Sequence, residues 1–268
     1  MSEIVNDGKN LLYLRDNFFV GQIPVLENST ITIKGRGNIL ISEKDVRIND
    51  SKIIFEGNNS IVFLSASNYA YRLDLQVYSE SIVAFGKNNY FNSNVSLIVS
   101  EGKNFLCGKE CLFAKDIRIR TSDHHLIYDI ETSKRINYGK SVYIGDNCWI
   151  CEDSKILKGV IIGSGTIVGA GSLVSMRKLR SNEMWGGIPV KCIKKNVCFL
   201  STSPVKWTEQ EILQHDDLKT NNFVFEKKLE NEYVFEEIEE KVRGLNNQAK
   251  CEFIINLFEN SDKNRFAF

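Results

Sequence analysis

Aliphatic side chains recur at every sixth position through the middle of this chain. Between residues 142 and 174 they occupy Ile144, Ile150, Ile156, Ile162, Val168 and Val174. A helix would carry such positions around its surface and a strand alternates with a period of two, so a period of six is typical of neither alone. It predicts a β-solenoid, in which three hexads form one triangular turn and each turn buries its apolar side against the next.

A second set of positions follows the same period. The residues two before each aliphatic are small or β-branched, which suits a second inward position close to a corner. They are Val142, Cys148, Ser154, Val160, Thr166 and Ser172. Gly145, Gly163 and Gly169 each follow an aliphatic position directly, and we expect the backbone to bend at these glycines.

The N-terminal part, residues 31–119, carries a looser form of this pattern. Apolar residues occur there in pairs two positions apart, separated by turns rich in Gly and Asn, which tolerate a positive φ. The pairs are Ile31/Ile33, Ile39/Ile41, Val46/Ile48, Ile53/Phe55, Ile61/Phe63, Ile82/Ala84, Val95/Leu97 and Ile117/Ile119. We favour an irregular continuation of the solenoid with corner insertions, although a separate β-sandwich would show the same alternation.

The C-terminal part changes to a helical pattern. Thr208 followed by Glu211 forms a capping box, and two apolar stripes at helical spacing run over residues 235–245 and 254–258. We expect these helices to pack on the solenoid or on a neighbouring subunit and to cover the open end of the coil. The predicted organisation is a lead-in over residues 1–30, a β-helix over 31–200 with a loop at 120–141, and a helical extension over 201–268.

Composition narrows the class of protein. The 268 residues are 43% apolar and carry 34 basic and 34 acidic side chains, which indicates a folded protein without net charge. No apolar run approaches the roughly 18–20 residues that cross a bilayer, and the first residues lack a basic stretch followed by an apolar one. We therefore expect a cytoplasmic protein with no integral membrane segment and no nucleic-acid partner, with peripheral attachment to the inner membrane left open.

The seven cysteines are scattered, which indicates reduced thiols rather than a disulfide framework. Cys148 and Cys151 have the spacing of half a zinc or redox motif. The hexad register turns Cys148 inward and places Cys151 at a corner, so we interpret both as structural.

The six-residue rhythm breaks between Ile119 and Val142. This excursion contains His124 and His125, two of the three histidines in the chain. A loop that leaves a rigid scaffold is a common place for functional residues, and an imidazole accepts protons near neutral pH. Both histidines are therefore candidates for a general base, with a solvated loop histidine as the alternative.

Three stretches together resemble a known family: residues 122–129 (SDHHLIYD), residues 144–150 (IGDNCWI) with the following hexads, and residues 185–191 (WGGIPVK). In order and spacing, the region of about residues 115–197 is similar to the hexapeptide-repeat, left-handed β-helix acetyltransferases. It most resembles bacterial O-acetyltransferases of capsular and surface glycans, including those of sialic acid and polysialic acid. The resemblance implies a mainly β, left-handed parallel β-helix that uses acetyl-CoA without a metal. It also implies a homotrimer with its sites between subunits.

Acetyl transfer to a sugar hydroxyl requires a base, donors for the developing oxyanion and a slot for the pantetheine arm. The resemblance makes His125, rather than His124, the base in direct transfer, although Leu126 stands where many relatives have proline. It also implies that Trp149 forms a wall of the acceptor and thioester site, with subunit packing as the alternative. Candidates to orient the imidazole or hold the acceptor are Asp123, Tyr128, Asp129 and Arg120, although aspartates also cap turns.

The C-terminal hexads and the turn after them resemble a CoA site. Glycines leave one side of the coil bare for pantetheine, and a local excess of Lys and Arg suits the phosphates. The stretch at 185–191 is similar to the Gly-x-Pro-Ala-Lys element that lines the CoA end of the cleft in the family. The residues expected to bind CoA are Gly163, Gly169, Ala170, Arg177, Trp185, Gly187, Pro189, Lys191 and Lys195. For any single glycine, a purely structural corner role is the alternative.

The basic residues Arg118, Arg120, Lys134 and Arg135 near the loop would suit an acidic glycan, although solvated charge is the ordinary interpretation. Two other functions stay open: N-acetylation of an amino sugar or nucleotide sugar, and a non-catalytic β-helix scaffold. A zinc enzyme resembling the γ-class carbonic anhydrases is disfavoured, because two of the three histidines are adjacent and His215 lies in the tail.

Overall fold

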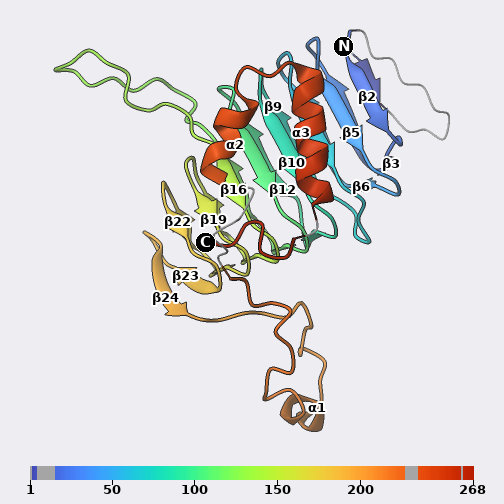
Figure 1. Ribbon diagram of the computed structural model, residues 1–268, viewed down its shortest axis with the longest axis vertical. Coiled ribbons are helices and arrows are strands. Elements are labelled where there is room, and N and C mark those ends of the chain that lie inside the picture. Colours follow the sequence, from blue (N-terminus) through green and yellow to red (C-terminus); the bar gives the residue numbers. More distant parts are fainter. Residues whose placement is uncertain (1, 5–15, 227–234, 261) are drawn as a thin grey trace.

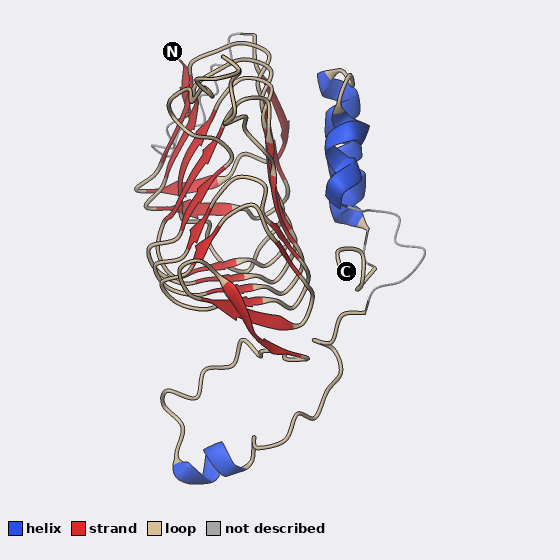
Figure 2. Cartoon of the chain, turned by 90° about the vertical axis from the view of Figure 1, so that its left-hand side faces the viewer, coloured by secondary structure: helices blue, strands red, loops and turns tan. Residues whose placement is uncertain are grey.

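The computed structural model of the chain describes residues 2–4, 16–226, 235–260 and 262–268. Its strands wind into a coil of about seven turns (Figures 1 and 2). From one turn to the next, equivalent strands pair in parallel, as Ile61 pairs with Ile82 and Ile82 with Asn104, whereas the first and last strands, β1 (Ser2–Ile4) and β24 (Lys191–Lys195), pair antiparallel. The predicted fold class, a left-handed parallel β-helix with an extended loop and a helical C-terminal region, is confirmed.

Three sheets form the sides of the coil. Sheet 1 contains β1 (Ser2–Ile4), β4 (Thr30–Ile33), β7 (Lys52–Phe55), β9 (Leu73–Val77), β12 (Val95–Val99), β15 (Arg118–Arg120), β18 (Lys155–Ile156) and β21 (Leu173–Val174). Sheet 2 contains β2 (Phe18–Gly21), β5 (Ile39–Ser42), β8 (Ile61–Leu64), β10 (Ile82–Phe85), β13 (Asn104–Cys107), β16 (Val142–Ile144), β19 (Ile161–Ile162) and β22 (Lys178–Leu179). Sheet 3 contains β11 (Tyr90–Phe91), β14 (Leu112–Phe113), β17 (Trp149–Ile150), β20 (Ile167–Val168), β23 (Glu183–Gly186) and β24 (Lys191–Lys195), and the pair β3 (Val25–Glu27) and β6 (Arg47–Asn49) continues the same side.

The hexads fill the interior of the coil as predicted. All six aliphatic residues, from Ile144 to Val174, are fully buried, and the six positions that precede them by two are at most 1% exposed. Cys148 is among them, and Cys151 is half-buried at a corner. All seven cysteines are free thiols.

The glycines do not make the bends that we predicted for them. The left-handed φ values lie two residues further on, at Asn147 (49°), Gly165 (74°) and Gly171 (66°). Gly145 and Gly163 are required for a different reason, which is the close approach of successive turns. A Cβ at Gly163 would lie 2.7 Å from the backbone nitrogen of Ser181 in the next turn.

Residues 31–119 form turns of the same coil and not a separate β-sandwich. Their parallel ladders continue without interruption through β12, β15 and β18. The apolar pairs of sheet 2 differ from the inward-facing hexad positions, because Ile39/Ile41, Ile61/Phe63 and Ile82/Ala84 face outward. The intervening residues, such as Leu40 and Val62, fill the interior instead. These strands are apolar on both faces because both faces are buried.

The outer face of sheet 2 is covered by two helices, α2 (Phe235–Val242) and α3 (Asn247–Glu259). Phe258 stacks on Phe63 with ring centroids 5.3 Å apart, and Phe235 stacks on Tyr143 at 5.2 Å. The helices therefore lie along a side of the coil (Figure 2), and the expectation that they cover its open end is wrong.

The third helix, α1 (Glu209–Leu213), begins with the predicted capping box of Thr208 and Glu211. It buries none of its residues and lies apart from the coil (Figure 2). Among the described residues no helix is long and apolar enough to cross a membrane.

The C-terminal segment is fastened to the coil by a buried ion pair. The Arg265 guanidinium lies 2.9 Å from the Asp146 carboxylate, and the two side chains are only 2% and 1% exposed. Asp146 also accepts the backbone N–H of Lys109 at 2.8 Å. Removal of either partner would leave the other charge buried without its counter-ion, which is costly.

Candidate functional site

The predicted loop is an arm that leaves the coil between β15 and β16 and extends into solvent (Figure 1). We define the arm as residues 122–138. Its two strands are held by the Asp129 N–H donating to the Lys134 carbonyl at 2.9 Å and the Ile136 N–H donating to the Ile127 carbonyl at 3.0 Å. His124 and His125 are both exposed and lie close to the root of the arm.

The root of the arm is organised by Asn137, which is only 6% exposed. Its Nδ2 donates to the His125 carbonyl oxygen at 2.7 Å and to the Asp123 carboxylate at 3.0 Å, and its Oδ1 accepts the Ile127 N–H at 2.9 Å. Lys158, from a corner of the next turn, donates to the same Asp123 oxygen. The hydrogen bonds from Lys158 and Asn137 hold the pKa of Asp123 below its usual value. Asp123 therefore holds Asn137, which fixes the backbone beside His125, and no hydrogen bond or ion pair joins it to an imidazole among the described residues.

The remaining residues predicted on the arm have different surroundings. Asp129 caps a turn by accepting the N–H and hydroxyl of Thr132 at 2.7 and 2.9 Å, and these hydrogen bonds lower its pKa. Arg135 is bound to Glu101 at 2.7 Å, which neutralises part of its charge. Tyr128 is 54% exposed and free to meet a ligand or partner, whereas Arg120 is half-buried in sheet 1.

The arm exposes an unusual amount of apolar surface. Ile130 is 95% exposed at its tip, and Leu126, Ile127, Tyr128, Ile136 and Tyr138 are each at least half exposed. Large exposed apolar surface on a folded protein is typical of a contact with another molecule.

Trp149 lies on β17 in sheet 3 and is half-buried against Phe199, with ring centroids 5.6 Å apart. Its indole Nε1 is buried and has no hydrogen-bond acceptor among the described residues. The arm leaves from the corner between sheets 1 and 2, on the far side of the coil from sheet 3, and extends outward (Figure 1). A single chain therefore does not bring His125 and Trp149 together.

The glycines predicted to line a CoA slot divide into two kinds. Gly163 is buried against the next turn, so its small size is explained by coil packing alone. Gly169, Ala170 and Gly171 form an open corner, and a Cβ at Gly171 would meet nothing within 4 Å. The hydroxyl of Ser172 links this corner to the next turn, because it donates to the Gly169 carbonyl and accepts the Gly187 N–H at 3.1 Å.

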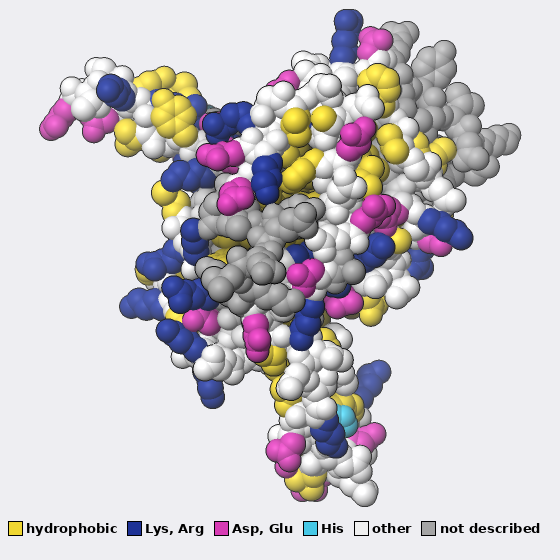
Figure 3. Space-filling model, in the orientation of Figure 1, with side chains coloured by type: hydrophobic (Ala, Val, Ile, Leu, Met, Phe, Trp, Pro, Cys, Tyr) yellow, Lys and Arg dark blue, Asp and Glu magenta, His cyan; other side chains and the backbone are white. Residues whose placement is uncertain are grey.

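The turn after β23 borders this open corner. Trp185 is half-buried, and its Nε1 donates to Glu183 at 3.0 Å, while Gly187 and Pro189 are exposed. Strand β24 returns antiparallel to β23 and carries the exposed side chains of Lys191 and Lys195. Arg177 is exposed at an earlier corner. Figure 3 shows Lys and Arg side chains gathered over this C-terminal end of the coil.

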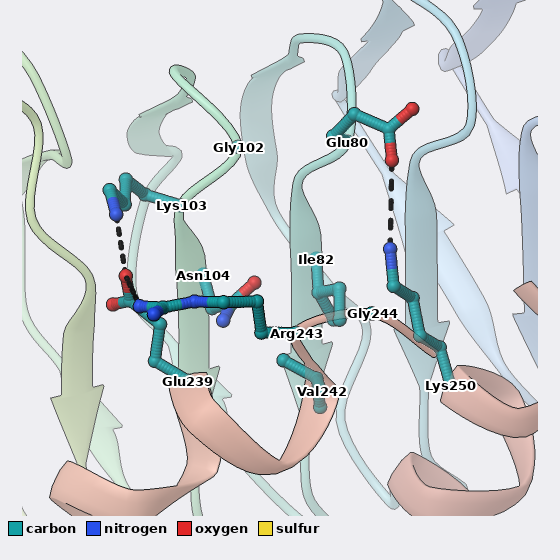
Figure 4. Close-up of a pocket in the computed structure, with 10 residues that line it drawn as sticks. All are labelled: Glu80, Ile82, Gly102, Lys103, Asn104, Glu239, Val242, Arg243, Gly244 and Lys250. Carbon is teal, nitrogen blue, oxygen red and sulfur yellow. Dashed lines mark hydrogen bonds and ion pairs between the residues drawn. The ribbon is translucent and has the colours of Figure 1, made fainter. Parts of the chain in front are cut away.

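A hollow of about 250 Å³ lies between α2, α3 and sheet 2, near the root of the arm (Figure 4). Its charges pair with one another: Lys103 with Glu239, and Lys250 with Glu80 at 3.6 Å. Burial raises the pKa of Glu239, but the hydrogen bonds from Lys103 and Ser141 outweigh it and the pKa is lowered. This hollow therefore serves to fasten the helices to the coil.

Sequence reasoning missed Asn137, Lys158, Glu101 and Phe199. All four act through contacts with residues distant in the sequence, and no local motif marks them. Among the described residues, no group of three or more His, Cys, Asp or Glu side chains is arranged to hold a metal ion.

Comparison with known proteins gives a consistent picture. The family model described as bacterial transferase hexapeptide (six repeats) matches residues 141–175. The polysialic acid O-acetyltransferase of Neisseria meningitidis is 30% identical over 135 residues, which cover 50% of this chain and 62% of that protein. The polysialic acid O-acetyltransferase of Escherichia coli O1:K1 / APEC is 40% identical over 105 residues, 39% of this chain and 34% of that protein. The chain thus spans less than two thirds of the length of both curated relatives.

Two solved structures share the fold over a longer stretch. The crystal structure of the polySia-specific acetyltransferase NeuO matches with a TM-score of 0.64 and 30% identity, over 75% of this chain and 93% of that chain. The polysialic acid O-acetyltransferase OatWY matches with a TM-score of 0.56 and 24% identity, over 73% of this chain and 95% of that chain. This second match shows similarity of fold alone.

Proposed function

This chain belongs to the hexapeptide-repeat, left-handed β-helix acetyltransferases, and from that premise we propose that it transfers an acetyl group from acetyl-CoA to a sugar hydroxyl. We propose a bacterial surface or capsular glycan of the sialic acid type as the acceptor. The relatives named as polysialic acid O-acetyltransferases support this choice of substrate.

In the proposed reaction His125 accepts the proton of the acceptor hydroxyl as the oxygen attacks the thioester carbonyl. A base positioned in this way contributes typically 10²–10⁴-fold to such a rate. Collapse of the tetrahedral intermediate breaks the C–S bond, and the thiolate takes the proton from the imidazolium. No covalent enzyme intermediate forms. His124 is the alternative base, since both side chains are exposed at the root of the arm.

The observation that carries this proposal is that the arm and Trp149 lie on opposite sides of one coil. The arm exposes both histidines near its root, and Trp149 offers a buried indole N–H without an acceptor among the described residues. An unpaired buried donor is unfavourable and is relieved by a ligand acceptor. We propose that the arm of one subunit reaches sheet 3 of the next in a homotrimer, a head-to-tail contact that closes into a ring.

The proposed CoA slot runs along the open corner of Gly169, Ala170 and Gly171 and the turn at Gly187 and Pro189. Backbone groups that approach a ligand without intervening side chains suit the amides of pantetheine. Lys191, Lys195 and Arg177 are then positioned to attract the phosphates, and Trp185 to cover the pantetheine or the adenine. Gly163 is not part of this slot as we now propose it, because it is buried between turns.

The test is CoA release from acetyl-CoA in the presence of sialylated and neutral glycans. The release is followed by chromatography because the half-buried thiols of Cys151, Cys192 and Cys198 would compete for a thiol reagent. Release that depends on a sialylated acceptor and falls at least about 100-fold in His125→Ala supports the proposal. Activity that survives in His125→Ala and is lost in His124→Ala moves the base to His124. An absence of both turnover and CoA binding in the wild type overturns the proposal and favours a scaffold.

A further inference from the structure

A second surface with the composition of a glycan site lies on the N-terminal turns, outside the proposed active site. It is a hollow of about 410 Å³, within the range of roughly 300–1,000 Å³ that is typical of small-molecule sites. Two arginines, two tyrosines and two asparagines dominate its lining, and no acidic side chain belongs to it within the described part of the chain. These residues are Arg47, Asn68, Tyr69, Arg72, Tyr90 and Asn92.

The two tyrosines form adjoining walls of the hollow. Tyr69 is 45% exposed and Tyr90 39%, and their rings meet edge to face with centroids 5.2 Å apart. Below them the structure is rigid, because Phe91 is buried and stacks on Phe113 at 5.2 Å. An aromatic ring with a flat apolar face and a polar hydroxyl suits a sugar, which presents both C–H groups and hydroxyls. A wall that is already fixed loses little freedom when a ligand binds.

The charge of the hollow is positive. Arg47 is exposed, and its Nη2 donates to the Asn68 carbonyl at 2.7 Å, which fixes the guanidinium and leaves other N–H groups for a ligand. Arg72 is paired with Asp50 at 2.6 Å, so its charge is largely compensated. A planar guanidinium binds carboxylates with two parallel hydrogen bonds, and Arg47 is therefore the principal group for an acidic ligand.

The register of sheet 3 connects this hollow with the proposed active site. Tyr90 pairs with Leu112, and Leu112 pairs with Trp149. Their side chains therefore lie in one column, two strands apart, and strand spacing puts about 10 Å between their positions. A polymeric ligand with one unit at Trp149 can extend along this side to the hollow.

We propose that the hollow is an accessory binding site for an acidic glycan polymer. It holds a unit remote from the one that is acetylated and so favours long acceptors over short ones. The assignment of the ligand rests on the proposed function. The structure itself provides the hollow, its two tyrosine walls and Arg47, which forms no ion pair among the described residues.

The kinetic test compares a short sialic acid oligomer with polysialic acid as acceptors of the full-length enzyme. In Tyr90→Ala and Arg47→Gln, we expect the KM for the polymer to rise about fivefold or more, with kcat and the KM for the short oligomer unchanged. Tyr90→Phe keeps the ring and should raise the KM for the polymer less than Tyr90→Ala does. Arg36→Gln is the matched control, because Arg36 is an exposed arginine of the N-terminal turns outside the hollow. An unchanged polymer KM in both Tyr90→Ala and Arg47→Gln overturns the accessory site.

A binding measurement separates this proposal from the proposed function. Calorimetry with polysialic acid and no acetyl-CoA should show binding by the wild type that weakens in Arg47→Gln and is unchanged in His125→Ala. If no glycan is acetylated but this pattern of binding holds, the accessory site stands and the transferase function falls. If acetylation occurs and polymer binding is unchanged in both Arg47→Gln and Tyr90→Ala, the accessory site is overturned and the transferase function is not. A change of oligomeric state in Tyr90→Ala, measured by light scattering, would show a contact between copies of the chain and overturn the glycan assignment.

Discussion

Replacing Asn137 by alanine should free the histidines from the coil without unfolding the coil. The substitution removes four hydrogen bonds, those to the Ile127 N–H, the Arg135 Nε–H, the His125 carbonyl and the Asp123 carboxylate. Two neutral hydrogen bonds at about 1 kcal/mol each and two to charged groups at about 1.5–3 kcal/mol each give an upper limit of roughly 5–8 kcal/mol. Because the four share one side chain and water replaces part of each, we expect about 2 kcal/mol, a factor of about 30 in the equilibrium that keeps the root ordered.

The assay has two independent readouts. Hydrogen exchange at the Ile127 amide should accelerate, and kcat/KM for acetyl transfer should fall by up to about 30-fold while the melting temperature hardly changes. Thr132→Ala is the matched control, since it removes the hydrogen bond of the Thr132 hydroxyl to Asp129 from the exposed turn of the arm and none from its root. An Asn137→Ala variant with wild-type exchange at Ile127 and kcat/KM within about twofold of wild type would refute the idea that this root positions the histidines.

Three further predictions concern the fold, pH and the CoA slot. Arg265→Met should lower the free energy of unfolding by about 3–5 kcal/mol, because it leaves the Asp146 carboxylate buried without its cation; a loss below about 1 kcal/mol in urea denaturation would count against this. The pKa of Asp123 is lowered in the folded protein, so the ionised carboxylate stabilises the arm root fully above the unfolded pKa of about 4. This stabilisation is lost as the pH falls through the lower folded pKa. Lys158→Met should raise the folded pKa of Asp123 in an NMR titration, and an unchanged pKa would exclude Lys158 as the main cause of the lowered value. Gly163→Ala should destabilise the coil, since the new Cβ would lie 2.6 Å from Ser181 Oγ. In Gly169→Ala the new Cβ would lie 3.4 Å from the Trp185 carbonyl oxygen, so this variant should fold and should raise the KM for acetyl-CoA. A lower melting temperature for Gly169→Ala than for Gly163→Ala would contradict both assignments.

The coil was predictable from residues 142–174, because the six-residue period is unbroken there and the strands on each side of the coil are short. The six-residue repeat predicts that every aliphatic side chain of the set is buried, and Ile144 to Val174 are buried without exception. In the N-terminal turns the strands of sheet 2 are apolar on both faces, so alternation alone does not show which face is inside. The outward position of Ile61 and Phe63 becomes clear only when helices α2 and α3, some 170 or more residues later in the sequence, lie on them.

The candidate residues of the site were predictable from the sequence, but the residues that hold them in place were not. A loop with adjacent histidines stands out against a regular repeat, and Trp149 stands out at an outward position of a hexad. The contacts of Asn137 with Asp123 and His125, and of Lys158 with Asp123, depend on how the arm returns to the coil. Such contacts follow from tertiary structure, as does the burial of Gly163, which sequence spacing does not distinguish from the open corner at Gly169.

The most direct test of the account is complementation between two inactive variants. Chains with His125→Ala and chains with Trp149→Ala are co-expressed with different tags, and assemblies that contain both are purified and assayed for CoA release with polysialic acid. If the arm of one subunit completes the Trp149 site of the next, each variant alone is inactive. Every trimer that contains both variants then has one complete site of its three, so the purified mixed assemblies regain about a third of the wild-type activity. Mixed assemblies no more active than the separate variants would contradict the account and place His125 and Trp149 in a site within one chain or in separate roles.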